Sequence, residues 1–110
     1  MVKEDSTYEN NPIKIGQNAS DNDKIITEAR QCDIWFHLAD FPSCHVVISV
    51  SKEYPVTKQM IEYCAGLVKE NTKYRDMNRL RVNYCEVKNV QRTDVVGRVI
   101  LKGGVKSVVV

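Results

Sequence analysis

The sequence lacks the features that would place it in a membrane, in the secretory pathway or among the zinc fingers. No apolar run approaches the ~20 residues that a membrane helix requires, and the opening MVKEDSTYEN lacks the basic-then-apolar pattern of a signal peptide. The cysteines are Cys32, Cys44, Cys64 and Cys85, and no two of them form a CxxC pair. These absences favour a cytoplasmic protein with reduced thiols and no membrane association.

Low-complexity segments, internal repeats and linkers are absent as well. The 110 residues are 43% hydrophobic and 27% charged, which is ordinary for a soluble globular chain. A chain of this length buries roughly 60 to 70% of its unfolded surface around one core. We therefore expect a single folded domain over residues 12–110, preceded by a flexible polar arm over residues 1–11.

Net positive charge is absent from the first two thirds of the chain and concentrated in the last third. Residues 1–68 carry six Lys/Arg and ten Asp/Glu, a net charge of −4, whereas residues 69–110 carry ten and four, a net charge of +6. Such an asymmetry indicates either a basic face for a polyanion or a solvated charged surface. If this part binds RNA, some of its cations must lie beside the site, and the candidates are Arg79, Arg81, Lys88, Arg92 and Arg98.

The spacing of apolar residues predicts an α+β fold with a mainly antiparallel sheet and about two helices. One helix is expected at residues 21–31, with Ser20 as its N-cap, and a longer amphipathic helix at residues 57–71. Gly103-Gly104 is expected to form a two-residue hairpin turn, because glycine accepts positive φ angles. The expected strands are residues 12–16, 33–38, 45–50, 81–88, 95–102 and 105–110.

Polar and aromatic side chains gather on one face of the first predicted hairpin. Successive side chains of a strand point to opposite faces of the sheet. The pairing that sets Trp35 opposite Val47 and His37 opposite His45 keeps the apolar side chains of both strands on the core side. Asp33 shares the face of Trp35 by the same parity. We expect this second face to be exposed or half-exposed.

The predicted polar face has the chemistry of a nucleic-acid site. A tryptophan offers a flat ring for base stacking, worth ~1–3 kcal/mol per base. Histidines donate to phosphate or to base edges, and an aspartate fixes a histidine tautomer or accepts from a base amino group. The same residues are also compatible with a purely structural role, in which Trp35 packs under a loop or helix and the histidines bond to the backbone.

Two other sites can be drawn from the same residues. A zinc site would use Cys32, His37, Cys44 and His45, but this spacing is not that of known fingers and the cysteines would lie on the opposite face. An acid–base set for phosphodiester cleavage would use Asp33 with the two histidines, but no nucleophile or metal cluster accompanies it. We therefore expect no metal, no cofactor and no catalytic residues.

Four segments of the chain resemble the NFACT-R domain. They are IKIGQNASDNDKI, DIWFHLADFPSCHVVI, MIEYCAGLVKEN and VNYCEVKNV followed by GRVIL, and they span about residues 12–102. The NFACT-R domain is part of the ribosome-associated quality-control factors that bind tRNA on stalled large subunits, and it also occurs in smaller stand-alone proteins with nucleic-acid affinity. The resemblance implies an RNA-binding module.

The resemblance also implies positions for the contacts. The family's G-R-N-x-x-x-N-D element marks Asn18 and Asn22, with Gln17 in place of the usual arginine. Its D-x-W-x-H element falls on Asp33, Trp35 and His37. Its G-S-H turn falls on Ser43, Cys44 and His45, with Ser-Cys in place of Gly-Ser, and a basic position falls on Lys88.

Together these patterns predict a stand-alone, non-enzymatic RNA-binding module of the cytoplasm that binds tRNA or ribosomal RNA. Its expected nucleic-acid-binding residues are Asp33, Trp35, His37, His45, Asn18, Asn22, Arg81 and Lys88. An adaptor that docks on the ribosome or on a quality-control factor through the same face is the main alternative, and a small nuclease is the third. The sequence leaves open which RNA is bound, whether the ribosome is a partner, and the oligomeric state.

Overall fold

The computed structural model describes residues 1–110 as one domain with two α-helices and an antiparallel six-stranded sheet. The strands of this sheet lie in the order β1 (Lys3–Asp5), β2 (Ile13–Ile15), β4 (Val46–Ile48), β3 (Ile34–Leu38), β5 (Arg81–Glu86) and β8 (Lys106–Val109). The other elements are the helices α1 (Ala19–Glu28) and α2 (Lys58–Glu70), a 3-10 turn η1 (Val87–Asn89), and the strands β6 (Val90–Arg92) and β7 (Val99–Leu101), which form a small second sheet. No helix is long and apolar enough to cross a membrane.

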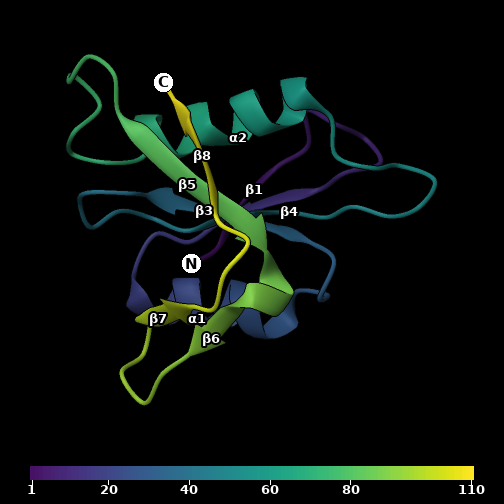
Figure 1. Cartoon of the computed structure of the whole chain (residues 1–110), viewed down its shortest axis with the longest axis horizontal. Coiled ribbons are helices and arrows are strands. Elements are labelled where there is room, and N and C mark those ends of the chain that lie inside the picture. The colour runs from purple at the N-terminus through teal and green to yellow at the C-terminus, as the bar shows by residue number, and fades with distance from the viewer.

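The large sheet is covered on both of its faces (Figure 1). Helix α2 packs across one face, where Phe36 of β3 and Val68 of α2 belong to the same buried cluster. Helix α1 and the β6–β7 sheet cover the other face, where Ile25, Trp35 and Val90 belong to a second cluster. The predicted α+β class, with a mainly antiparallel sheet and two helices, is confirmed.

The predicted pairing of β3 with β4 is confirmed, but the predicted exposure of one face is wrong for most of its residues. Trp35 lies opposite Val47 in the antiparallel register, as expected. Trp35 is nevertheless only 2% exposed and His45 only 3%, because α1 and β6–β7 cover this side. His37 alone among the expected face residues is half-buried. Trp35 therefore has no free ring face on which a base could stack.

Both helices form close to where they were expected, with one different cap. Helix α2 is capped by Thr57, whose side chain accepts from the backbone N–H of Met60. Helix α1 begins two residues earlier than predicted, and its N-cap is Asn18 rather than Ser20. The Asn18 Oδ1 accepts from the backbone N–H of Asp21 at 2.8 Å. Asparagine and serine cap helices equally well, so the choice between them was not fixed by residue type.

The predicted hairpin turn at Gly103-Gly104 is wrong. Strand β7 pairs with β6, and β8 pairs with β5 at the edge of the large sheet. Both glycines do have positive φ, 133° and 65°, but they carry the chain from the small sheet to the large one. Residues 1–11, expected to be a flexible arm, contain strand β1, which pairs with β2.

Burial on both faces makes a prediction about stability. We expect Trp35→Ala to cost about as much as Phe36→Ala, ~3–5 kcal/mol of unfolding free energy each, because both side chains are buried. The control is Val96→Ala at a side chain 57% exposed, which should stay within about 0.5 kcal/mol of the parent. Urea unfolding followed by circular dichroism measures all three. A Trp35→Ala variant as stable as the parent would contradict the burial of this face.

Candidate functional site

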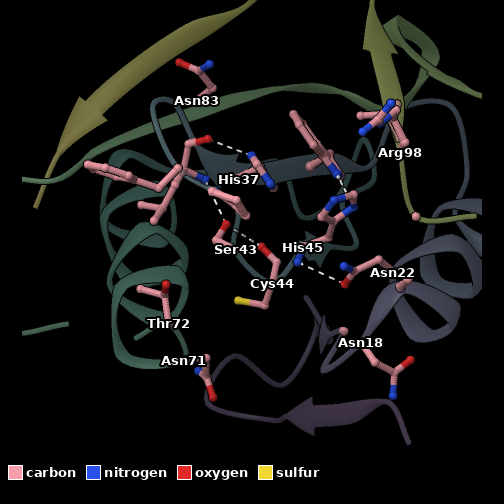
Figure 2. Close-up of a pocket in the computed structure, with 18 of the residues that line it drawn as sticks. Asn18, Asn22, His37, Ser43, Cys44, His45, Asn71, Thr72, Asn83 and Arg98 are labelled. Carbon is pink, nitrogen blue, oxygen red and sulfur yellow. Dashed lines mark hydrogen bonds between the residues drawn. The ribbon is translucent and has the colours of Figure 1, made fainter. Parts of the chain in front are cut away.

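A hollow of about 1150 Å³ opens where four parts of the chain meet (Figure 2). Its walls are the β2–α1 turn with the start of α1, the β3–β4 loop, the segment that follows α2, and the β6–β7 turn. The polar side chains in its lining are mainly uncharged amides, hydroxyls and imidazoles. Only Asp40, Lys73 and Arg98 among the lining residues carry a formal charge.

Two histidines lie side by side at the centre of this hollow (Figure 2). The ring centroids of His37 and His45 are 5.0 Å apart and their planes are perpendicular. Both residues come from the paired strands: His37 is in β3, and His45 directly precedes β4. The antiparallel register that aligns β3 with β4 therefore also brings the two rings together.

The hydrogen bonds of the two histidines fix opposite tautomers. The indole Nε1–H of Trp35 donates to His45 Nδ1 at 3.1 Å. Because an indole nitrogen only donates, His45 Nδ1 accepts, and in the neutral ring the proton lies on Nε2. His37 Nδ1 lies 2.6 Å from the carbonyl oxygen of Leu38, which only accepts. His37 therefore carries its proton on Nδ1, and its Nε2 is an acceptor.

Burial keeps both imidazoles neutral. Desolvation, with an additional contribution from the neighbouring His37, lowers the pKa of His45 to about 3. Desolvation also lowers the pKa of His37, against the opposing effect of its hydrogen bond to the Leu38 carbonyl. At neutral pH the pair thus presents one acceptor nitrogen and one N–H donor.

The β2–α1 turn holds His45 in place. The backbone N–H of His45 donates to Asn22 Oδ1 at 3.1 Å, and its carbonyl accepts from Gly16 N–H at 2.9 Å. A β-carbon at Gly16 would overlap Asn22 Oδ1 and crowd the Asn22 backbone. Glycine is therefore required here by the close approach of the two segments, since its φ is ordinary.

The chain matches a known protein family. The family model described as the NFACT protein RNA binding domain matches residues 1–108. The chain belongs to the NFACT-R family.

Relatives and a solved structure agree with this assignment. The chain is 31% identical over 90 residues to the Rqc2 homolog RqcH of Bacillus subtilis, covering 78% of this chain and 15% of that protein. It is 32% identical over 92 residues to the coiled-coil domain-containing protein 25 of Mus musculus, covering 80% and 43%. The C-terminal part of the fibronectin/fibrinogen-binding protein from Streptococcus suis has a similar fold, with a TM-score of 0.80 and 27% identity over 91% of this chain and 40% of that one. The chain spans less than half the length of each of these relatives.

The NFACT-R elements divide between the hollow and the scaffold around it. The expected site residues that line the hollow are Asn18, Asn22, Trp35, His37 and His45. Asp33 does not, and it is only 3% exposed. Its carboxylate accepts from the backbone N–H groups of Arg30 and Val50, at 2.9 and 3.1 Å. Asp33 therefore joins the start of β3 to the segment after β4 and does not face the histidines.

The basic residues that line the hollow differ from those expected. Arg81 lies outside the lining and donates to Asp40 at 3.0 Å, and Lys88 lies outside it with its ammonium 3.9 Å from a Glu86 oxygen. Arg98, one of the candidates, is in the lining, and so is Lys73, which sequence reasoning did not select. Asn71, Thr72 and Asn83 were missed as well. These residues come together only through the packing of α2 and β5 on β3, and the sequence carries no local signal of it.

The close approach at Gly16 predicts opposite signs for two Gly→Ala changes. Gly16→Ala should destabilise the fold by ~1–3 kcal/mol because its methyl group overlaps Asn22. Gly66→Ala is the matched control, since Gly66 lies inside α2 with no atom near its β-position. It should stabilise by ~0.5–1 kcal/mol through helix propensity. Denaturant unfolding of both variants checks the signs, and a Gly16→Ala protein as stable as the parent would refute the contact.

The burial of His45 predicts how stability depends on pH. The folded pKa of about 3 lies below the ordinary histidine pKa of 6.5, so folding favours the neutral ring. The resulting contribution to the free energy of unfolding is complete above about pH 6.5. It is lost as the pH falls toward 3, and each pH unit below about 6 removes about 1.4 kcal/mol. The carboxyl groups of Asp5, Asp21 and Asp23 also have lowered pKa values. Their contributions to the free energy of unfolding are lost only below about the ordinary aspartate pKa of 3.8.

An NMR titration tests the His45 pKa directly. The chain has two histidines, so a His37→Phe variant leaves His45 as the only imidazole signal. We expect that signal to stay constant from pH 8 to about 5. A midpoint near that of a free histidine would contradict both the burial of the ring and its assigned tautomer.

Proposed function

We propose that this chain is an RNA-binding module and that RNA binds in the hollow around His37 and His45. The observation that carries the proposal is the composition of the hollow, which combines an uncharged polar interior with two cations that make no ion pair, Lys73 and Arg98. The family description as an RNA-binding domain supports it.

The placement of the two cations suits a strand of RNA. Arg98 lies in the β6–β7 turn, across the hollow from Asn71 and Thr72, which precede Lys73 (Figure 2). Cations neutralise phosphates and position the backbone, whereas uncharged donors and acceptors contact sugars and base edges. The hollow offers both kinds of contact, cations for phosphates and uncharged polar groups for sugars and bases.

We further propose that the module serves ribosome-associated quality control in the cytoplasm, with tRNA or ribosomal RNA as its ligand. The relative from Bacillus subtilis is named as an Rqc2 homolog, which supports this context. We propose no enzymatic activity, because His45 is not suited to general acid–base catalysis at neutral pH and so cannot act with His37 as an acid–base pair. Burial lowers the pKa of His45 to about 3, far from the operating pH that such catalysis favours.

A protein-binding adaptor is the second candidate. The relative from Streptococcus suis is named for binding fibronectin and fibrinogen. In the present chain the β6–β7 sheet and its turn expose three aliphatic side chains, Val95, Val96 and Ile100, each more than half exposed. Such side chains suit a protein partner better than an RNA backbone, so the experiment below includes an outcome for this candidate.

The proposal predicts which cations set the salt dependence of RNA binding. Lys73→Gln and Arg98→Gln should each weaken binding of tRNA, duplex RNA and single-stranded RNA and reduce the slope of log K against log salt by roughly one. Lys88→Gln is the matched control and should change neither, because Lys88 lies outside the hollow. Fluorescence anisotropy of labelled RNAs across a salt series measures both quantities.

The same series separates the two candidates. If neither substitution changes the RNA affinity or the salt slope, the hollow is not the RNA site. An absence of RNA binding, together with salt-insensitive binding of the intact protein to ribosomes stripped of accessible RNA by nuclease, would favour the adaptor. The labelled RNAs should remain full-length throughout, and cleavage that His37→Phe abolishes would instead support a nuclease.

A further inference from the structure

The two central histidines present a specific pair of hydrogen-bonding groups to the hollow. The bond from Trp35 leaves an N–H donor on His45 Nε2, and the bond to the Leu38 carbonyl leaves an acceptor on His37 Nε2. Neither Nε2 atom has a hydrogen-bond partner within the chain, and no unpartnered side-chain nitrogen is fully buried. Both nitrogens therefore reach the surface of the hollow.

This pair of groups restricts what can bind between the rings. Phosphate oxygens at neutral pH only accept, so a phosphate would leave the His37 acceptor unsatisfied. A metal cation or an ammonium group has no acceptor, so it would leave the His45 N–H unsatisfied. A hydroxyl group both donates and accepts, and ring centroids 5.0 Å apart are close enough for one small group to contact both rings.

We propose that His37 and His45 bind the 2′-hydroxyl of one ribose, which donates to His37 Nε2 and accepts from His45 Nε2–H. This inference rests on the proposed RNA-binding function and specifies the chemical feature of RNA that is selected. The 2′-hydroxyl distinguishes RNA from DNA, so the pair makes the module specific for RNA.

The surroundings of the pair hold the two groups in this orientation. Trp35, which sets the tautomer of His45, is 2% exposed and cannot turn away. The backbone of His45 is fixed on both sides by Asn22 and Gly16. With Lys73 and Arg98 as the cations of the same lining, the phosphates of the bound nucleotide have partners separate from the histidines.

The test compares RNAs that differ only at the 2′ position. The probes are an RNA of about 12 nucleotides, single-stranded and as a duplex, in 2′-hydroxyl, 2′-O-methyl and 2′-fluoro forms. Both modified sugars keep the conformation of RNA but lack the hydroxyl proton. The parent protein should bind them roughly 2- to 12-fold more weakly than the 2′-hydroxyl form, as expected for the loss of one hydrogen bond.

The variants show whether this preference comes from His37. In His37→Phe, which keeps a ring but has no acceptor, the preference for the 2′-hydroxyl form should fall to about one, as in a double-mutant cycle. His37→Ala, which also has no acceptor, serves if the phenylalanine variant does not fold by circular dichroism. Lys73→Gln is the control and should weaken binding of all three forms equally, with the preference unchanged.

The outcomes separate this inference from the proposed function. Equal binding of the three forms by the parent protein, with a salt slope that still depends on Lys73 and Arg98, would overturn the hydroxyl contact and leave RNA binding standing. A preference that persists in His37→Phe would also overturn it. If the parent shows no preference and His37→Phe weakens binding of all three forms equally, His37 contacts a base edge instead of the 2′-hydroxyl. No binding of any form would overturn the proposed function itself.

Discussion

The buried hydrogen bond from Trp35 to His45 is the interaction on which the fold and the site both depend. A buried indole N–H without a partner is costly, and the partner here is a ring nitrogen on the neighbouring strand, 3.1 Å away. Because this bond is satisfied, Trp35 can fill the space between the sheet and α1, where it belongs to the second buried cluster. The same bond decides which nitrogen of His45 faces the hollow, so one contact links packing to recognition.

Coverage of the sheet on two faces explains why the sequence predicted the geometry of β3 but not its exposure. Parity and register follow from alternation within two strands, and both were correct for Trp35 opposite Val47. Exposure depends on what else packs there. The apolar residues that cover Trp35 come from α1 and from the η1–β6 segment, among them Ile25 and Val87. The sequence shows that these side chains need burial but does not show where they find it.

The differences between the expected site residues and the lining of the hollow have a similar origin. Asp33 and Trp35 share a face by alternation, yet the Asp33 carboxylate is held by the N–H groups of Arg30 and Val50, a local turn contact that parity does not describe. Arg81 was a candidate from the charge count, and Lys88 from the charge count and the family resemblance, but each has an acidic neighbour in the fold. A pair of glycines with positive φ suits a hairpin turn and a crossover equally. The path of the chain after β7 therefore depended on β5, whose free edge pairs with β8.

In the hollow, the groups that would attract RNA by charge, Lys73 and Arg98, are different from the groups that would select it, His37 and His45. Only two unpaired cations line it, so in the proposed binding mode counterion release would give a shallow salt dependence and a modest affinity. Affinity of this kind rises sharply when a second contact tethers the same RNA, because binding then depends on effective concentration. The proposed selection by two neutral histidines would not depend on charge and would be insensitive to salt. A module built in this way can therefore remain selective for the chemical identity of its ligand while its total affinity is set by whatever else holds the ligand nearby.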